Sequence, residues 1–402
     1  MQNTTQPPLK ILHTSDWHLG QKFMGKSRED EHKKFLKWLI DTINKYKVDV
    51  LIVAGDIFDT GTPPNYALEL YYSFFAELKS TSCQDTIIIA GNHDSISTLK
   101  APKNVLELLN VYTIASGEED ESILKIHKDG SLAGIVCAVP FLRDSVIRKS
   151  IFGESMQDKE TALRDGIKAH YQKVHNIAKN IQNSKPIPII ATGHFTTVGT
   201  KSSDSERDIY IGNTLNISSD FLAPMFDYVA LGHLHHAQKV GYEHIRYSGS
   251  PIPLSFSEAD SQKSVQLITF EGLDLKIEQI NIPTYKKLYR IGGNKEQIIS
   301  QLQNIEDKNS WIELEIEDDN AYVALQEIQE HISQANLNVL AKKIAKPTTD
   351  IAIGDIEITN LDAMTPFDIF EKRLELEEIS DEELIKQLKI EFQKIEAKVV
   401  VS

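Results

Sequence analysis

Short apolar runs alternate with longer segments of helical periodicity over the first 280 residues of the chain. Apolar positions spaced three and four residues apart predict helices at residues 31–46 and 65–78. Runs rich in β-branched residues predict strands at residues 9–15, 48–54, 86–90, 134–139, 187–192 and 228–231. Strands that are apolar on both faces are typical of a sheet that is covered on both sides. The alternation therefore predicts an α/β sandwich flanked by helices.

The pattern changes after Pro283. Residues 285–345 have the order strand, helix, strand, helix, strand, which predicts a small α+β domain. Two short segments with capping boxes and apolar stripes then predict C-terminal helices. We expect a main domain, a small domain, a linker and a pair of terminal helices, at residues 1–282, 283–345, 346–364 and 365–402.

Metal-ligand side chains follow five of the predicted strands. Each stands next to a glycine or a sharp turn, in the motifs DWH, GD, GNHD, GH and GHLH. Sites in α/β sheets form at the carboxyl ends of strands, and residues i and i+2 of an extended segment point to the same side. Nitrogen and oxygen ligands without a thiolate suit Mn²⁺, Fe²⁺ or Zn²⁺. The candidate ligands are Asp16, His18, Asp56, Asn92, His194, His233 and His235.

Seven ligands are too many for one cation with open positions, but they fit two, with Asp56 as the candidate bridge. The formal net charge of −15 excludes a uniformly basic nucleic-acid-binding surface, so a nucleic-acid partner needs a local basic strip or bound metal. Two divalent cations bring +4 and two carboxylates −2, which leaves about +2 to attract a phosphate group.

The ordered motifs D-x-H, GD, GNH[DE], GH and GHxH resemble the metallophosphoesterase superfamily. Within it, the segments around these motifs are similar to the nuclease subunits of bacterial SbcC–SbcD complexes, from about residue 9 to residue 280 and more weakly beyond. These segments are HTSDWHLGQ, VAGDIFDTGTPP, AGNHDS, IIATGHFTTVG, RDIYIG, ALGHLHHAQ and RYSGSPIPLSF.

The resemblance implies two manganese ions, each with its own ligand set. The first set is Asp16, His18, Asp56 and His235, and the second is Asp56, Asn92, His194 and His233. His93 matches a histidine that is not a ligand and stabilises the scissile phosphate. Asp94 either orients that imidazole or caps a helix. Asp59 stands where archaeal and eukaryotic relatives have a second catalytic histidine, so the leaving-group acid is Asp59, another group or a bound water.

The resemblance also implies an ATP-dependent double-strand exonuclease with single-strand endonuclease and hairpin-opening activity, which acts in DNA repair, replication and recombination. No GxxxxGK[ST] phosphate loop is present, so ATP hydrolysis must come from a partner. We expect residues 365–402 to bind the SbcC ATPase, or alternatively to dock on the small domain. The helix at 65–78 is core on one face, and its remaining apolar surface suits a homodimer contact, which would give a heterotetramer with SbcC.

Basic residues near the motifs are candidate contacts with the DNA backbone, although each is explained equally well as a solvated charge. They are Lys22, Lys26, Arg28, Arg143, Lys201 and Arg207. Two other functions stay open: a phosphomonoesterase or cyclic-nucleotide phosphodiesterase of the same fold, and a metal-poor scaffold that regulates a partner. We expect no signal peptide and no membrane span, and therefore a cytoplasmic protein.

Overall fold

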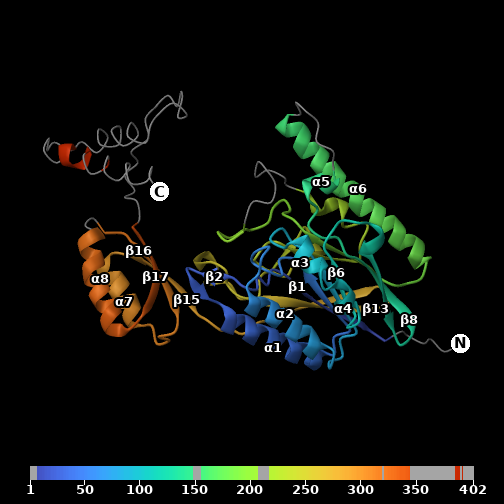
Figure 1. Ribbon diagram of the computed structural model, residues 1–402, viewed down its shortest axis with the longest axis horizontal. Coiled ribbons are helices and arrows are strands. Elements are labelled where there is room, and N and C mark those ends of the chain that lie inside the picture. Colours follow the sequence, from blue (N-terminus) through green and yellow to red (C-terminus); the bar gives the residue numbers. More distant parts are fainter. Residues whose placement is uncertain are drawn as a thin grey trace. The chain divides into compact units, whose positions relative to one another are not determined.

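The computed structural model describes residues 7–147, 155–206, 217–318, 321–344, 385–389 and 392. Within these residues, two six-stranded sheets face each other (Figure 1). The first has the order β14 (Asp274–Asn281), β13 (Ser264–Glu271), β1 (Leu9–Thr14), β4 (Val50–Ala54), β5 (Asp85–Ile89) and β6 (Val111–Ile114). The second has the order β11 (Gln238–Val240), β12 (Tyr242–Tyr247), β10 (Tyr228–Gly232), β9 (Ile189–His194), β8 (Ser131–Cys137) and β7 (Ile123–Lys128).

The central strands of each sheet are parallel. β4 pairs in parallel with β1 and β5, with Leu51 opposite Leu12, and β9 pairs in parallel with β8 and β10. Successive residues of β4 alternate between two cores: Ile52 faces the core between the sheets, while Leu51 and Val53 face the outer helices. Because the strands are parallel, their carboxyl ends lie at one edge of each sheet.

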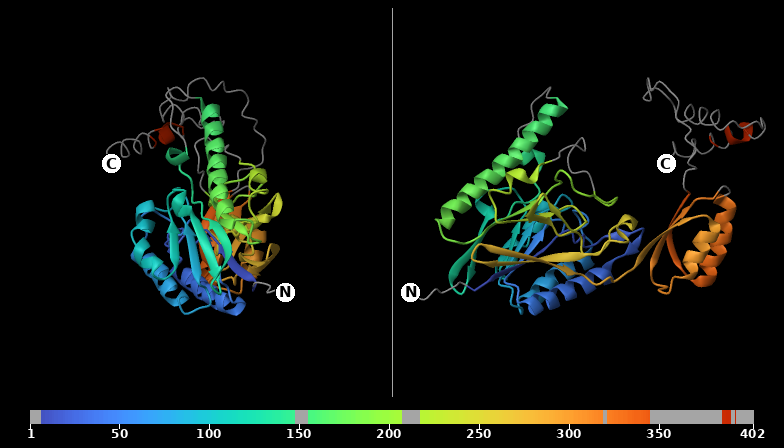
Figure 2. Two further views of the ribbon diagram at one scale, coloured as in Figure 1. Left: turned by 90° about the vertical axis from the view of Figure 1, so that its right-hand side faces the viewer. Right: turned by 180° about the vertical axis from the view of Figure 1, so that it is seen from behind.

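Helices cover the outer face of each sheet (Figure 2). α1 (Glu29–Tyr46) and α2 (Asn65–Leu78) share one core with β1 and β4. α6 (Met156–Gln182) covers the second sheet with a stripe of buried residues that includes Ile167 and Val174. Shorter elements are β2 (Lys22–Phe23), β3 (Lys26–Ser27), α3 (Ile96–Lys100), α4 (Lys103–Glu107), η1 (Asp120–Ser122), α5 (Asp144–Ile147), η2 (Ser219–Phe221) and η3 (Phe256–Glu258).

The residues after the sandwich form a three-stranded parallel sheet with two helices. Its elements are β15 (Leu288–Gly293), α7 (Lys295–Gln303), β16 (Trp311–Ile316), α8 (Ala321–Ala335) and β17 (Asn338–Ile344). Ile298, Leu314 and Ile328 lie at the centre of a separate apolar core. The indole of Trp311 stacks on Phe23 of β2, with 5.3 Å between ring centroids. This part therefore contacts the segment that follows the first motif.

The sandwich predicted from the sequence is confirmed, and α2 has the predicted bounds. The strand–helix–strand–helix–strand order after Pro283 also matches, whereas the proposed domain boundaries stay predictions. The linker and most of residues 365–402 lie outside the described residues. No helix among the described residues combines the length and apolarity needed to cross a membrane.

Candidate metal centre

Strand ends from both sheets bring the predicted ligands together. Asp16 and His18 follow β1, Asp56 follows β4, and His233 follows β10. The segments after β1 and β4 remain hydrogen bonded beyond the sheet, from Asp16 N to Gly55 O at 2.9 Å and from His18 N to Asp56 O at 3.0 Å. The ligand-bearing loops are thus held in register by backbone hydrogen bonds.

Four ligand residues adopt left-handed backbone conformations. The φ angles are 53° at Asp16, 45° at His18, 50° at Asp56 and 98° at His233. Such conformations cost about 1–3 kcal/mol each for residues other than glycine, and they persist only where the surrounding structure enforces them. Their concentration at one place supports it as the candidate functional site.

Two glycines allow the loops to approach this closely. A Cβ atom at Gly91 would lie 2.1 Å from Asp56 Oδ1, and one at Gly232 would lie 1.9 Å from the Ala54 carbonyl oxygen. Both distances are far below van der Waals contact, so any side chain at either position displaces the Asp56 loop or its neighbours.

Two ligand clusters meet at Asp56. The ligand atoms of each cluster lie within 4.8 Å of one another. Asp56 Oδ2 lies 3.6 Å from His18 Nε2 and 3.3 Å from His194 Nε2, and Asn92 Oδ1 lies 3.0 Å from the same His194 nitrogen. The clusters are Asp16, His18 and His235, and Asp56, His194 and His233; a third, less buried group is His18, Asp59 and His93. All seven predicted ligands are therefore in one place.

Hydrogen bonds on the far side of two imidazoles fix which nitrogen faces the centre. His194 Nδ1 lies 2.9 Å from the Ala54 carbonyl oxygen, and His18 Nδ1 lies 3.2 Å from Asp59 Oδ1. Among the described residues, the buried His18 Nε2 has no hydrogen-bond partner. A bound cation would satisfy this nitrogen, so the donor set fits divalent cations with mixed nitrogen and oxygen ligands.

The buried charges shift pKa values in opposite directions across the centre. Burial lowers the pKa of His194, but the Asp56 carboxylate outweighs it and raises this pKa to about 9. Burial raises the pKa of Asp56, yet the neighbouring His194 charge holds it well below its usual range. Burial and the His194 charge together lower the pKa of His233 far below 6.5. Strong coupling among buried ionisable groups is typical of functional sites.

His93 and Asp59 lie beside the first cluster. The His93 backbone N–H donates to Asp56 Oδ1 at 2.9 Å, and its ring centroid is 4.8 Å from that of His18. His93 Nδ1 lies 2.8 Å from the Asp59 carbonyl oxygen. The Asp59 side chain is 25% exposed. Both residues thus stand where a substrate could reach them.

Asp94 has a different role from either predicted one. Its carboxylate accepts hydrogen bonds from the backbone N–H groups of Ile57, Phe58 and Gly91, at 3.2, 3.0 and 2.8 Å. Ser95 rather than Asp94 caps helix α3, because its hydroxyl accepts from the Thr98 N–H. Asp94 therefore ties the loop after β4 to the loop after β5, and the N-cap prediction is wrong.

The prediction of Arg28 as a DNA contact is also wrong, because its side chain is fully buried. The guanidinium donates to both Glu31 carboxylate oxygens, at 2.5 and 2.7 Å, and to the Pro253 carbonyl oxygen at 2.8 Å. Lys22, Lys26, Arg143 and Lys201 are exposed, and Arg207 lies outside the described residues.

The sequence did not indicate the residues that surround His235. Ser205 Oγ lies 2.6 Å from His235 Nδ1, Glu258 Oε1 lies 3.4 Å from the same atom, and Glu206 accepts from the His235 backbone N–H at 2.7 Å. Glu258 lies in the short helix η3, whereas Ser205 and Glu206 lie in the loop after β9. The available signals were the closeness of Glu258 to the RYSGSPIPLSF segment and of Ser205 and Glu206 to the RDIYIG segment.

Comparisons with known proteins agree with the motifs. Residues 9–237 match the calcineurin-like phosphoesterase family. The chain is similar to SbcD of the SbcCD nuclease of Escherichia coli (strain K12), at 40% identity over 93% of this chain and 94% of that protein. It is also similar to the SbcD proteins of Rhodobacter capsulatus (34% identity, 66% of this chain and 67% of that one) and Bacillus subtilis (30%, 77% and 79%).

Proposed function

The chain belongs to the calcineurin-like phosphoesterase family and, within it, to the SbcD proteins of SbcCD nucleases, and from this premise we propose that it is a two-metal DNA phosphodiesterase. As the nuclease subunit of an SbcC–SbcD complex, it degrades duplex DNA ends with ATP hydrolysis by SbcC, and it also cleaves single strands and opens hairpins. The observation that carries the proposal is the pair of adjacent buried ligand clusters, with Asp56 of one cluster 3.6 Å from His18 of the other.

The site binds divalent metal cations, and we propose two Mn²⁺ ions. Bound there, they would activate water and polarise the phosphoryl oxygens. The short distances from Asp56 Oδ2 to His18 and His194 support this carboxylate as the bridge. One ion would be held by Asp16, His18, Asp56 and His235, and the other by Asp56, Asn92, His194 and His233.

His93 and Asp59 are proposed to act on the substrate directly. The backbone hydrogen bond to Asp56 holds His93 beside the ligands, and its ring Nδ1 lies against the Asp59 carbonyl oxygen. The Asp59 carboxylate bonds to His18 Nδ1. It therefore orients a ligand, and it is the proposed leaving-group acid only in a protonated form.

DNA is proposed to approach over the exposed lysines Lys22, Lys26 and Lys201, with Arg143 beside the loop after β5. Arg143 donates to the Asp94 carbonyl oxygen at 3.2 Å. The proposed partners are SbcC, through residues 365–402, and a second copy of the chain, and the proposed compartment is the cytoplasm. Of the SbcC-binding segment, the structure describes helix only at residues 385–389 and at residue 392.

A nuclease assay tests the proposal. The full chain with Mn²⁺ is given single-stranded, hairpin and linear duplex DNA, with and without SbcC and ATP. We expect cleavage of the first two by the chain alone and degradation of duplex ends only in the complex with ATP. A chromogenic phosphomonoester serves as the competing substrate, and its preferred hydrolysis would identify a phosphomonoesterase instead.

The variant His93→Gln separates metal binding from phosphodiester cleavage. It should bind as much Mn²⁺ as the wild type, because no cation ligand is lost, while nuclease turnover falls by about 10²–10⁴-fold. Metal content is measured by elemental analysis and turnover by gel assay. Unchanged turnover would remove His93 from the mechanism, and fewer than one ion per wild-type chain would favour a metal-poor scaffold.

A further inference from the structure

A buried ion pair lies behind His235. Glu258 of η3 is fully buried, and its Oε2 lies 2.5 Å from Nζ of Lys263, whose side chain is 6% exposed. The Lys263 ammonium also donates to the His235 carbonyl oxygen and to Ser250 Oγ, each at 3.0 Å. Since an ammonium has three N–H groups, all are used and the lysine is fixed in place.

The second oxygen of Glu258 faces the imidazole of His235. Ser205 Oγ lies 2.5 Å from Glu258 Oε1 and 2.6 Å from His235 Nδ1. An ionised carboxylate only accepts hydrogen bonds, so the Ser205 hydroxyl donates its proton to Glu258. Its lone pair is then left to accept from an N–H at His235 Nδ1. This arrangement selects the tautomer in which Nε2 carries no proton.

A histidine binds a cation through an unprotonated nitrogen, and the group that bonds its other nitrogen sets both tautomer and ring orientation. Glu206 accepts from the backbone N–H of His235, and its Oε1 lies 4.0 Å from Nδ1, beyond hydrogen-bond distance, so it does not select the tautomer in this way. We infer that Glu258, held by Lys263 and acting through Ser205, is the positioning residue that directs His235 Nε2 to the first cation. The inference rests on the proposed metal centre.

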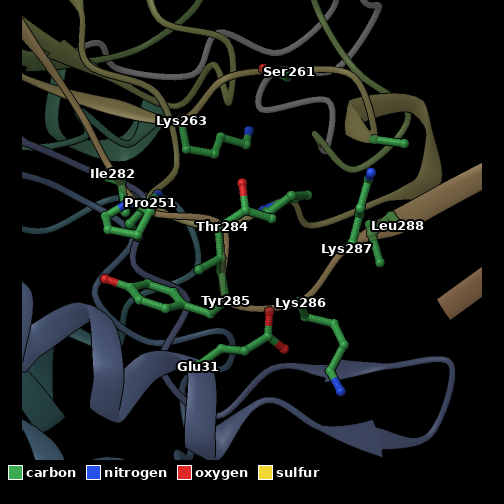
Figure 3. A pocket seen from close by; sticks show the side chains of 14 residues that line it. Glu31, Pro251, Ser261, Lys263, Ile282, Thr284, Tyr285, Lys286, Lys287 and Leu288 are labelled. Carbon is green, nitrogen blue, oxygen red and sulfur yellow. The ribbon is translucent and has the colours of Figure 1, made fainter. Parts of the chain in front are cut away.

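A second buried ion pair provides a control for a purely structural role. Glu31 is 4% exposed and is paired with Arg28. Glu31 and Lys263 line the same cavity of about 330 Å³ (Figure 3). Glu31→Gln therefore removes a buried charge in similar surroundings without removing a partner of any proposed ligand.

The test compares Glu258→Gln with Glu31→Gln in the full chain. Mn²⁺ binding is followed through the electron paramagnetic resonance signal of the free ion, and stability through thermal unfolding. We expect Glu258→Gln to weaken one of two Mn²⁺ sites by about 10–100-fold and Glu31→Gln to leave both unchanged. In metal-free protein with ¹⁵N-labelled histidine, the His235 signals should show one tautomer in the wild type and a mixture in Glu258→Gln.

A double variant separates positioning from stability. Glu258→Gln with Lys263→Met leaves no buried unpaired charge, so its melting temperature should recover towards the wild-type value. The weakened Mn²⁺ site should not recover, because His235 still lacks its carboxylate partner. Ser205→Ala removes only the hydroxyl bridge and should weaken the same Mn²⁺ site. If Glu258→Gln does not fold, the Mn²⁺ affinity of Ser205→Ala tests the positioning role instead.

Each result bears on one claim. A wild-type chain that binds no Mn²⁺ defeats the proposed metal centre itself. A wild type with two sites and a Glu258→Gln or Ser205→Ala chain of equal affinity defeats only the positioning role. Recovery of affinity in the double variant, or equal losses in Glu258→Gln and Glu31→Gln, would likewise show that Glu258 has a structural role only.

Discussion

Replacement of Arg28 by alanine tests how the small α+β part is joined to the sandwich. The guanidinium lies between the Glu31 carboxylate and two stacked rings, with its central carbon 5.2 Å from the Phe23 ring centroid and 5.3 Å from that of Trp311. Arg28→Ala leaves Glu31 buried without its partner, which costs about 3–5 kcal/mol. Each lost ring contact adds about 0.5–1 kcal/mol. We expect a loss of about 4–7 kcal/mol in the free energy of unfolding.

Urea unfolding of the full chain, followed by tryptophan fluorescence, measures this loss. Lys22→Ala is the matched control, since Lys22 is an exposed cation in the same segment, and it should change stability by less than about 0.5 kcal/mol. Arg28→Met with Glu31→Leu removes both charges and should regain most of the lost stability.

DNA binding at several salt concentrations tests whether either residue contacts the DNA backbone instead. A residue that contacts phosphate reduces the salt slope by about 1 when it is removed. We expect this for Lys22→Ala and not for Arg28→Ala. Stability within about 1 kcal/mol of the wild type, together with a reduced salt slope, would refute the buried role of Arg28 and restore it as a DNA contact.

Three further predictions concern the centre, the C-terminus and pH. Gly91→Ala should displace Asp56, because the new Cβ would lie 2.1 Å from Oδ1, and calorimetry should show loss of Mn²⁺ affinity; retained affinity would contradict the close packing. Deletion of residues 365–402 should spare Mn²⁺ binding and single-strand cleavage but abolish co-purification with SbcC; a truncated chain that still co-purifies would defeat the assignment. Burial lowers the pKa of His13 to about 3, so its contribution to stability is present above pH 6.5 and is lost as the pH falls towards 3. The unfolding free energy should therefore fall less steeply between pH 6 and pH 4 in His13→Gln than in the wild type, by up to about 1.4 kcal/mol per pH unit. Urea unfolding in the presence of a chelator measures this, and equal slopes of unfolding free energy against pH in the two chains would refute it.

That the candidate ligands lie together could be predicted because their signals are local. Asp16 and His18 stand two residues apart directly after an apolar strand, and His233 and His235 repeat the spacing. Parallel strands end at the same edge of a sheet, so strand periodicity and motif position suffice to bring these side chains together. The apolar run VLIVA before Gly55 and Asp56 is an equally clear strand signal, and every residue of β4 is indeed buried.

The surroundings of the ligands could not be predicted, because they depend on contacts between distant loops. Ser205 and Glu258 are separated by 53 residues along the chain and meet beside His235. Arg28 has a glutamate three residues later, a spacing that also occurs on exposed helices, and nothing local to it predicts burial. Asp94 follows the GNH motif but bonds backbone amides, which every segment possesses. Helix α6 was missed because its buried stripe is narrow and most of its residues are polar.

The acidic composition and the proposed DNA substrate are compatible because charge acts over short distances in salt. At physiological ionic strength, exposed charges farther apart than about 8 Å are largely screened, so the net charge of −15 says little about any one surface. The centre contains two carboxylates and four imidazoles, and two divalent cations bound there would make its local charge positive. Exposed lysines such as Lys22 and Lys26 then need only position the DNA backbone. Attraction for the scissile phosphate would thereby be concentrated at the proposed cations. For that reason we expect the groups proposed to orient the ligands, Asp59 at His18 and Glu258 at His235, to bear on substrate binding as well as on metal affinity.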